Sequence, residues 1–317
     1  MKKFLALLCV SIFLFSGVAA ADTFPSREIK MIIPFSAGGA TDIMARKLQP
    51  IMMDKFGVNL VVLNKEGGNS AVGLTELITA PADGYTVAIA SSTILILMGQ
   101  GQVKWGIEKF TNISLLSEDP MLLLVKNDAP WKTLDEFMNY VKENPGKIRA
   151  GTAAGKSVNH AMAISAGRSI DSEITHVPFK GASLALPALM GGHVECCVLK
   201  PSDSMAQIRA GEVRPLGIFR NSRIDPLPDV PTFEEKGYDV FPYGPVDQIS
   251  FIVAPAGISE EVRGKLTDMF KEAVLSTQFQ EYGKSAGFVS QPVTGKEFDD
   301  YLAKLSSALK EVAEKIF

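Results

Sequence analysis

The pattern that most constrains the fold of this 317-residue chain is an alternation of short apolar runs with amphipathic stretches, beginning near residue 29. Such alternation predicts mostly parallel β-sheets with helices on both faces, an α/β architecture. The first series contains expected strands and helices in turn, at 29–35, 41–56, 60–63, 71–79, 85–90 and 121–126.

A second series follows residue 126. Its first helix is expected to open at a capping box, Thr133-Leu-Asp-Glu136, and its proline-rich segment 224–231 is expected to be a loop. The other expected strands and helices are 147–152, 157–167, 173–179, 182–190, 194–200, 202–210, 213–219, 248–254, 259–276 and 295–316. The last helix is expected to open at a second capping box, Thr294-Gly-Lys-Glu297.

Two α/β series with a C-terminal return predict two lobes joined by two crossings. The length also exceeds that of a typical single core. We expect the crossings near 124–126 and 247–250. Lobe 1 would then contain 22–125 and 249–317, and lobe 2 would contain 126–248.

The N-terminus has the pattern of an export signal. Lys2 and Lys3 precede an apolar run at 4–15, and small residues at 18–21 predict cleavage near Ala20/Ala21. The run is too short to span a bilayer, so we expect signal peptide 1–21 and no stable membrane insertion. Its removal makes the formal net charge of −3 more negative, which argues against a nucleic-acid partner.

The segment Pro34-Phe-Ser-Ala-Gly-Gly-Ala-Thr-Asp42 places a small-residue loop between a predicted strand and a predicted helix. Small residues allow the backbone to approach a ligand, and the first-turn N–H groups of a helix favour an anion. The segment therefore suggests a carboxylate or phosphate site. The alternative is a tight turn in which Asp42 only stabilises the start of the helix.

The segment Gly151-Thr-Ala-Ala-Gly-Lys-Ser-Val-Asn-His160 repeats this arrangement in the second series. It approaches a phosphate-binding P-loop, but its glycine spacing is too short. We interpret it as an anion site with hydroxyl donors at Thr152 and Ser157.

Other chemistry has little support in the sequence. There is no Gly-x-Ser-x-Gly motif, no dinucleotide fingerprint, and no zinc-ligand spacing among His160, His176 and His193. We expect no catalytic residue, no metal and no cofactor. Cys196 and Cys197, on one apolar strand, are expected to be buried free thiols facing opposite sides.

The chain resembles the Bug/TctC family of periplasmic solute-binding proteins of tripartite tricarboxylate transporters. The resemblance extends along the mature chain and is carried by six motifs, which lie at 34–42, 62–69, 82–86, 177–181, 227–232 and 254–257. It implies a type II two-lobed periplasmic binding protein, or Venus flytrap, that encloses a small organic carboxylate. It also implies a periplasmic location, the transporter's membrane components as partners, and a protein that is not an enzyme. We expect a monomer.

The two loops that suggest an anion site coincide with the loops that grip the carboxylate in this family. The expected ligand-binding residues are Phe35, Ser36, Ala37, Gly38, Gly39, Thr41, Asp42, Ser91, Gly151, Thr152, Ala153, Ser157, His160, Phe179 and Lys200. Lys200 is hypothesised to pair with a second carboxylate, and the alternative is a solvated lysine. Other functions left open are an exported α/β hydrolase, with His160 beside Ser157, and a ligand sensor for a membrane kinase.

Overall fold

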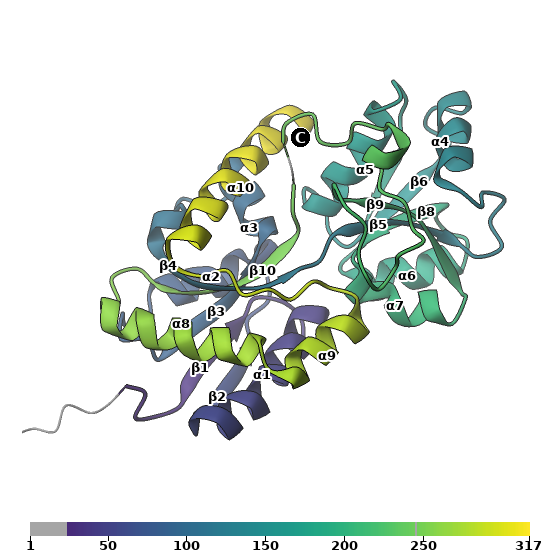
Figure 1. Ribbon diagram of the computed structural model, residues 1–317. Helices are drawn as coiled ribbons and strands as arrows, with labels where there is room; N and C mark the ends of the chain where they lie inside the picture. Colours follow the sequence, from purple (N-terminus) through teal and green to yellow (C-terminus); the bar gives the residue numbers. More distant parts are fainter. Residues whose placement is uncertain (1–23, 245) are drawn as a thin grey trace, which may run out of the picture.

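The computed structural model describes residues 24–244 and 246–317, so the predicted signal peptide lies outside the described residues. Two five-stranded sheets stand side by side (Figure 1) and confirm the predicted two-lobed α/β fold. The first sheet has the order β2 (Leu60–Asn64), β1 (Ile29–Ile33), β3 (Thr86–Ser91), β10 (Ile249–Pro255) and β4 (Phe110–Glu118). The second has the order β7 (Thr175–Pro178), β6 (Arg149–Thr152), β8 (Cys196–Leu199), β5 (Met121–Lys126) and β9 (Val213–Phe219).

The two sheets have the same pattern of strand directions. In each, the first three strands are parallel, and the fourth is antiparallel to both its neighbours. These fourth strands, β10 and β5, are the strands by which the chain enters a sheet from the other lobe. The parallel strands point their carboxyl ends to one edge, which is where α/β folds bind ligands.

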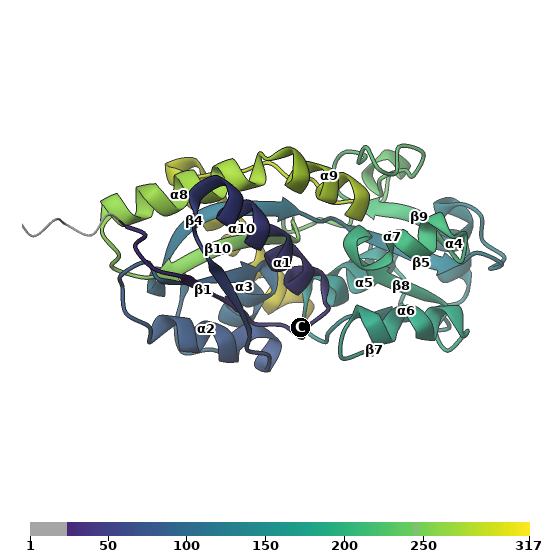
Figure 2. The ribbon, with the colours of Figure 1, turned by 90° about the horizontal axis from the view of Figure 1, so that it is seen from below.

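Helices cover both faces of each sheet because the central strands bury apolar side chains on both sides. In lobe 1, one face packs against α1 (Ala40–Phe56), α8 (Glu260–Val274) and α9 (Thr277–Ala286). Its other face packs against α2 (Ala71–Ile78), α3 (Ser92–Gly99) and α10 (Gly295–Ile316), and Figure 2 shows α8 and α2 on opposite sides of the sheet.

The second sheet is covered in the same way. Helices α4 (Leu134–Glu143) and α5 (Val158–Arg168) lie on one face, and α6 (Ala182–Met190) and α7 (Pro201–Arg209) lie on the other. Single 3₁₀ turns occur at η1 (Gly68–Ser70), η2 (Ile107–Lys109) and η3 (Glu234–Lys236). Cys196 and Cys197 are buried and free, on opposite faces of this sheet, as predicted.

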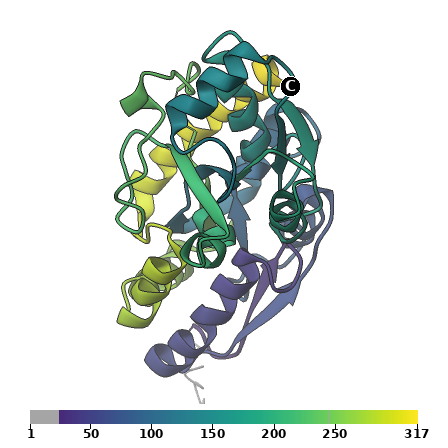
Figure 3. The same ribbon diagram turned by 90° about the vertical axis from the view of Figure 1, so that its right-hand side faces the viewer.

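The first crossing lies earlier than the predicted 124–126. Residues 121–126 pair with β8 and β9 of the second sheet, so only Asp119 and Pro120 separate β4 of the first sheet from β5 of the second. The lobes also meet at the end of α10, drawn in yellow in Figures 1 and 3, where Arg168 donates to the backbone oxygen of Lys315 at 3.0 Å.

The two predicted capping boxes had different outcomes. Thr133 accepts a hydrogen bond from the amide of Glu136, whose side chain accepts from the backbone of Thr133, so this box is confirmed. The box at Thr294 is wrong, because the side chain of Thr294 makes no capping hydrogen bond.

Candidate ligand-binding site

The two predicted anion loops lie at the carboxyl ends of parallel strands, one in each lobe. The first connects β1 to α1, and the second connects β6 to α5. The lobes approach each other beside these loops, where the side-chain amide of Asn69 in η1 donates to the backbone oxygen of Gly155 in the second loop at 3.5 Å. The edges that carry the predicted residues therefore face each other across the join between the lobes.

Asp42 holds the first loop together. One of its carboxylate oxygens accepts hydrogen bonds from the Gly38 amide and from Nε of Arg46, both at 2.9 Å, and the other accepts from the side chain of Asn64 at 3.0 Å. Burial would raise the pKa of Asp42, but these hydrogen bonds outweigh burial and hold its pKa below the usual value. Asp42 therefore has the structural role that the sequence left as the alternative, and the Gly38 amide is already paired.

The remaining amides of this loop are better placed for an anion. Gly39 is the N-terminal cap residue of α1 and has no side chain with which to cap the helix. No acceptor in the described part of the chain is bonded to the amides of Ala40 and Thr41. The hydroxyl of Ser36 is bonded to the carboxylate of Glu66, whereas the backbone amides at the start of the helix are available to an anion.

Most polar groups of the second loop are paired inside lobe 2. The hydroxyl of Thr152 contacts Nε2 of His176 at 2.7 Å and donates to the backbone oxygen of Ala154 at 2.9 Å. The hydroxyl of Ser157 donates to the same oxygen and caps α5. The backbone oxygen of Ala153 accepts from Gly181. The predicted hydroxyl donors Thr152 and Ser157 therefore shape the loop.

Gly151 and Phe179 pack against each other. A side chain at Gly151 would lie 2.8 Å from Sγ of Cys197 and 3.2 Å from the ring of Phe179, so the glycine is required by packing within lobe 2. This contact assigns Gly151 to the interior of the lobe, where no close approach of a ligand is needed to explain it.

His160 and His176 stack with ring centroids 3.4 Å apart, and the ring of Phe317 lies 4.8 Å from His160. Burial lowers the pKa of each imidazole to about 4. Nδ1 of His160 accepts from the Lys156 amide at 3.1 Å, and the Ser157 hydroxyl donates elsewhere. The base–nucleophile pair of a hydrolase is therefore absent from this described segment.

Lys200 is paired within the protein. Its ammonium lies 3.6 Å from Asp119 and 3.8 Å from Asp203, with only 16% of its side chain exposed. Asp119 lies in the first crossing and also accepts from Ser202, and burial raises its pKa although Lys200 opposes the shift. In this structure the partners of Lys200 are therefore two carboxylates of the protein itself, and its pairing with a ligand carboxylate stays a prediction.

Three buried polar groups at this edge have no hydrogen-bond partner in the described residues. They are the hydroxyls of Ser70 and Ser91 and the side-chain oxygen of Gln248. Ser91, at the end of β3, was predicted from the sequence. Ser70, before α2, and Gln248, before β10, were missed because neither lies in a recognisable motif.

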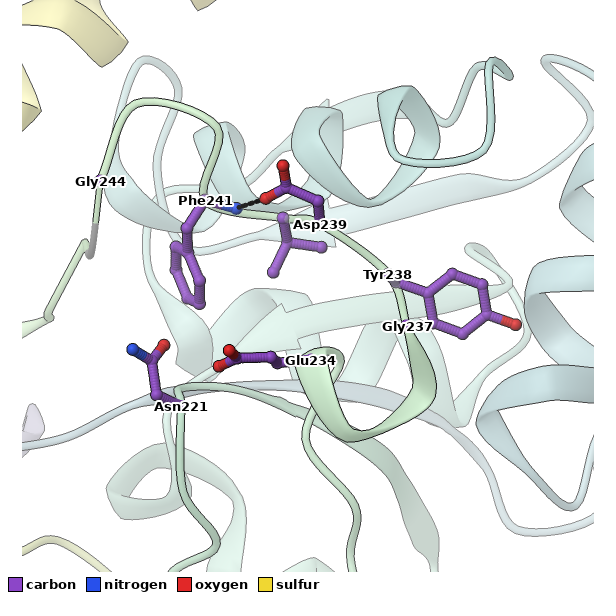
Figure 4. A pocket seen from close by; sticks show the side chains of 8 residues that line it. Asn221, Glu234, Gly237, Tyr238, Asp239, Phe241 and Gly244 are labelled. Carbon is purple, nitrogen blue, oxygen red and sulfur yellow. Dashed lines mark hydrogen bonds between the residues drawn. The ribbon is translucent and has the colours of Figure 1, made fainter.

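Two cavities lie outside the predicted residues. The larger, of about 400 Å³, contains none of them and is formed by the segment after β9 (Figure 4), with Asn221, Glu234 and Phe241 among its lining. The smaller, of about 300 Å³, adjoins the join between the lobes and is lined by Asn69, Leu97 and Gln102, among others. Only the smaller one touches the edge that carries Ser70.

Within residues 24–244 and 246–317, no cluster of three histidine, cysteine or acidic side chains could hold a metal ion. No helix in the same part of the chain has the length and apolarity needed to cross a membrane.

Comparison with known proteins places this geometry in a family. Residues 44–315 match the family model TctC, described as the tripartite tricarboxylate transporter family receptor. A UPF0065 protein of Bordetella pertussis is 31% identical over 276 residues, which cover 86% of this chain and 84% of that protein.

Solved structures agree. A structure described as a periplasmic transporter is 30% identical, with a TM-score of 0.84 over 92% of this chain and 98% of the other. MatC from Rhodopseudomonas palustris with bound malate is 26% identical, with a TM-score of 0.75 over 92% and 98%. The chain therefore belongs to the TctC family of periplasmic solute-binding proteins.

Proposed function

We propose that this protein captures a small organic carboxylate between its lobes in the periplasm and delivers it to the membrane components of a tripartite tricarboxylate transporter. The observation that carries the proposal is the uncapped start of α1, whose backbone amides without partners follow β1 at the same edge of the sheet where the buried hydroxyl of Ser91 ends β3. The family match and the malate complex of the relative MatC support it.

Unpaired amides at the positive end of a helix bind a carboxylate through charge-assisted hydrogen bonds. A ligand held by both lobes stabilises the closed arrangement in proportion to its preference for that state. We propose that the two crossings, at 119–120 and 247–248, act as hinges. Lobe 1, formed by 24–118 and 249–317, would then rotate against lobe 2, which lies between the crossings. The protein would act as a monomeric carrier without catalysis.

The test is a thermal-shift screen of organic acids, followed by calorimetry on each hit with wild type and Gly39→Val. A side chain at position 39 would lie 3.3 Å from the backbone oxygen of Ser36, and valine would cover the start of α1. We expect binding to be lost in Gly39→Val. The matched control is Gly264→Val, where an added side chain meets no atom within 4 Å. Wild-type affinity in Gly39→Val, or no hit among the acids, would contradict the proposal.

A further inference from the structure

Two buried side chains near the proposed site, Gln248 and Ser91, narrow the class of ligand; this inference rests on the proposed carboxylate-binding function. Gln248 is 8% exposed and Ser91 is 3% exposed, yet the side-chain oxygen of each lacks a hydrogen-bond partner among the described residues. A buried polar atom without a partner is costly, so each one calls for an explanation, such as a bound water, ion or ligand that completes its bonding.

Both side chains lie on one face of the lobe 1 sheet. Ser91 pairs with Ser250 across β3 and β10, and Ile89 pairs with Ile252. Those two isoleucines belong to the core beneath α1, so the pleat places Ser91 on the same face. Gln248 lies two residues before Ser250, immediately before β10 begins, and the same alternation of side chains places it on that face.

The surroundings of Gln248 are rich in acceptors. Its backbone oxygen accepts from the Asp119 amide at 2.8 Å, which joins the two crossings. Asp119 and Asp203 together face the single ammonium of Lys200, at 3.6 and 3.8 Å, so two carboxylates share one cation in this cluster. The start of α1, by contrast, offers the unpaired backbone amides of Ala40 and Thr41 as donors.

We infer that the ligand carries a hydrogen-bond donor, a hydroxyl or an ammonium group, in addition to its carboxylate, and that the side-chain oxygen of Gln248 accepts from it. The carboxylate binds at the start of α1, and Gln248 determines specificity. A site with a buried acceptor rejects an analogue that lacks the matching donor, because that analogue leaves the acceptor unpaired.

The test compares matched acids that differ only in the donor: succinate against malate and aspartate, and glutarate against 2-hydroxyglutarate and glutamate. We expect at least one hydroxy or amino acid to bind about tenfold or more tightly than its plain partner in calorimetry. Equal affinity within every set would overturn the inference and leave the proposed function standing. If none of the six acids binds, a hit in the organic-acid screen that lacks a donor would overturn the inference alone, and a screen without any hit would contradict both.

Variants of Gln248 test the residue itself. Gln248→Leu keeps the size but removes the acceptor, so the affinity ratio within a set should fall toward one. Gln248→Glu can only accept, so the ratio should persist even if all affinities fall. A persistent ratio in Gln248→Leu, or its loss in Gln248→Glu, would refute the assignment. Gln278→Leu, on the exposed side of α9, is the control and should leave the ratio unchanged.

Discussion

Replacing Asp42 with asparagine tests whether this carboxylate organises the first loop. Asparagine has one acceptor oxygen, whereas Asp42 uses one oxygen for Gly38 and Arg46 and the other for Asn64. If the new oxygen faces Gly38, the new amide nitrogen meets the amide nitrogen of Asn64. Rotating Asn64 would not relieve this contact, because its nitrogen also donates to the backbone oxygen of Phe35 at 3.1 Å.

The expected cost follows from these bonds. One buried hydrogen bond is lost, worth about 1 kcal/mol, and the bond from Gly38 loses its charge assistance, worth about 1 kcal/mol more. The bond from Arg46 reaches solvent and adds little. We therefore expect Asp42→Asn to lower the free energy of unfolding by about 2 kcal/mol in urea denaturation at pH 7.

The pH dependence of the free energy of unfolding tests the same role of Asp42. The pKa of Asp42 is lowered in the folded state, so its stabilisation is present above the usual aspartate pKa and is lost as pH falls toward and through the folded value. Wild type should lose more stability than the variant in acid. The control is Asp54→Asn, an exposed position on α1. A change below about 0.5 kcal/mol in Asp42→Asn would refute the structural role.

Three further predictions concern the lobes and their join. The pKa of His160 and of His176 is about 4, below the usual 6.5, so stability should fall as pH drops from 6.5 toward 4, and His160→Gln should reduce this dependence in urea denaturation. Lys200→Met should lower the free energy of unfolding by about 3–5 kcal/mol at pH 7, less in acid where Asp119 is protonated; an unchanged midpoint in urea would contradict the buried pairing. Gly287→Ala should destabilise by about 2 kcal/mol or more, measured in the same way, because Gly287 has φ +87° and an added side chain would overlap α7.

The sequence predicted the architecture because apolar periodicity and turn residues are local signals. It missed α3, since Ser92–Gly99 is apolar on all sides and shows no helical face. It missed β4 (Phe110–Glu118), a buried strand that shows no polar alternation. The failed capping box at Thr294 shows that a cap motif does not ensure the side-chain geometry of a cap.

The candidate site was predicted at the level of loops and less well at the level of side chains. The small-residue pattern identified the start of α1, but whether Asp42 contacts a ligand depends on Arg46 and Asn64, which no local pattern connects to it. Lys200 finds its partner Asp119 at the crossing, which is remote in sequence. Gln248 becomes notable only when its burial is known.

The position of β10 also has a consequence for the order of folding. This strand lies between β3 and β4 in the sheet, but along the chain it follows all the strands of the second sheet, which occupy 121–219. Until β10 docks, β3 and β4 have no strand between them, whereas all five strands of the second sheet come from one continuous stretch of chain. Contacts so distant along the chain form slowly because loop closure must precede them. Lobe 2 should therefore acquire protection from hydrogen exchange first during refolding. The sheet of lobe 1 should become protected last, when β10 inserts between β3 and β4.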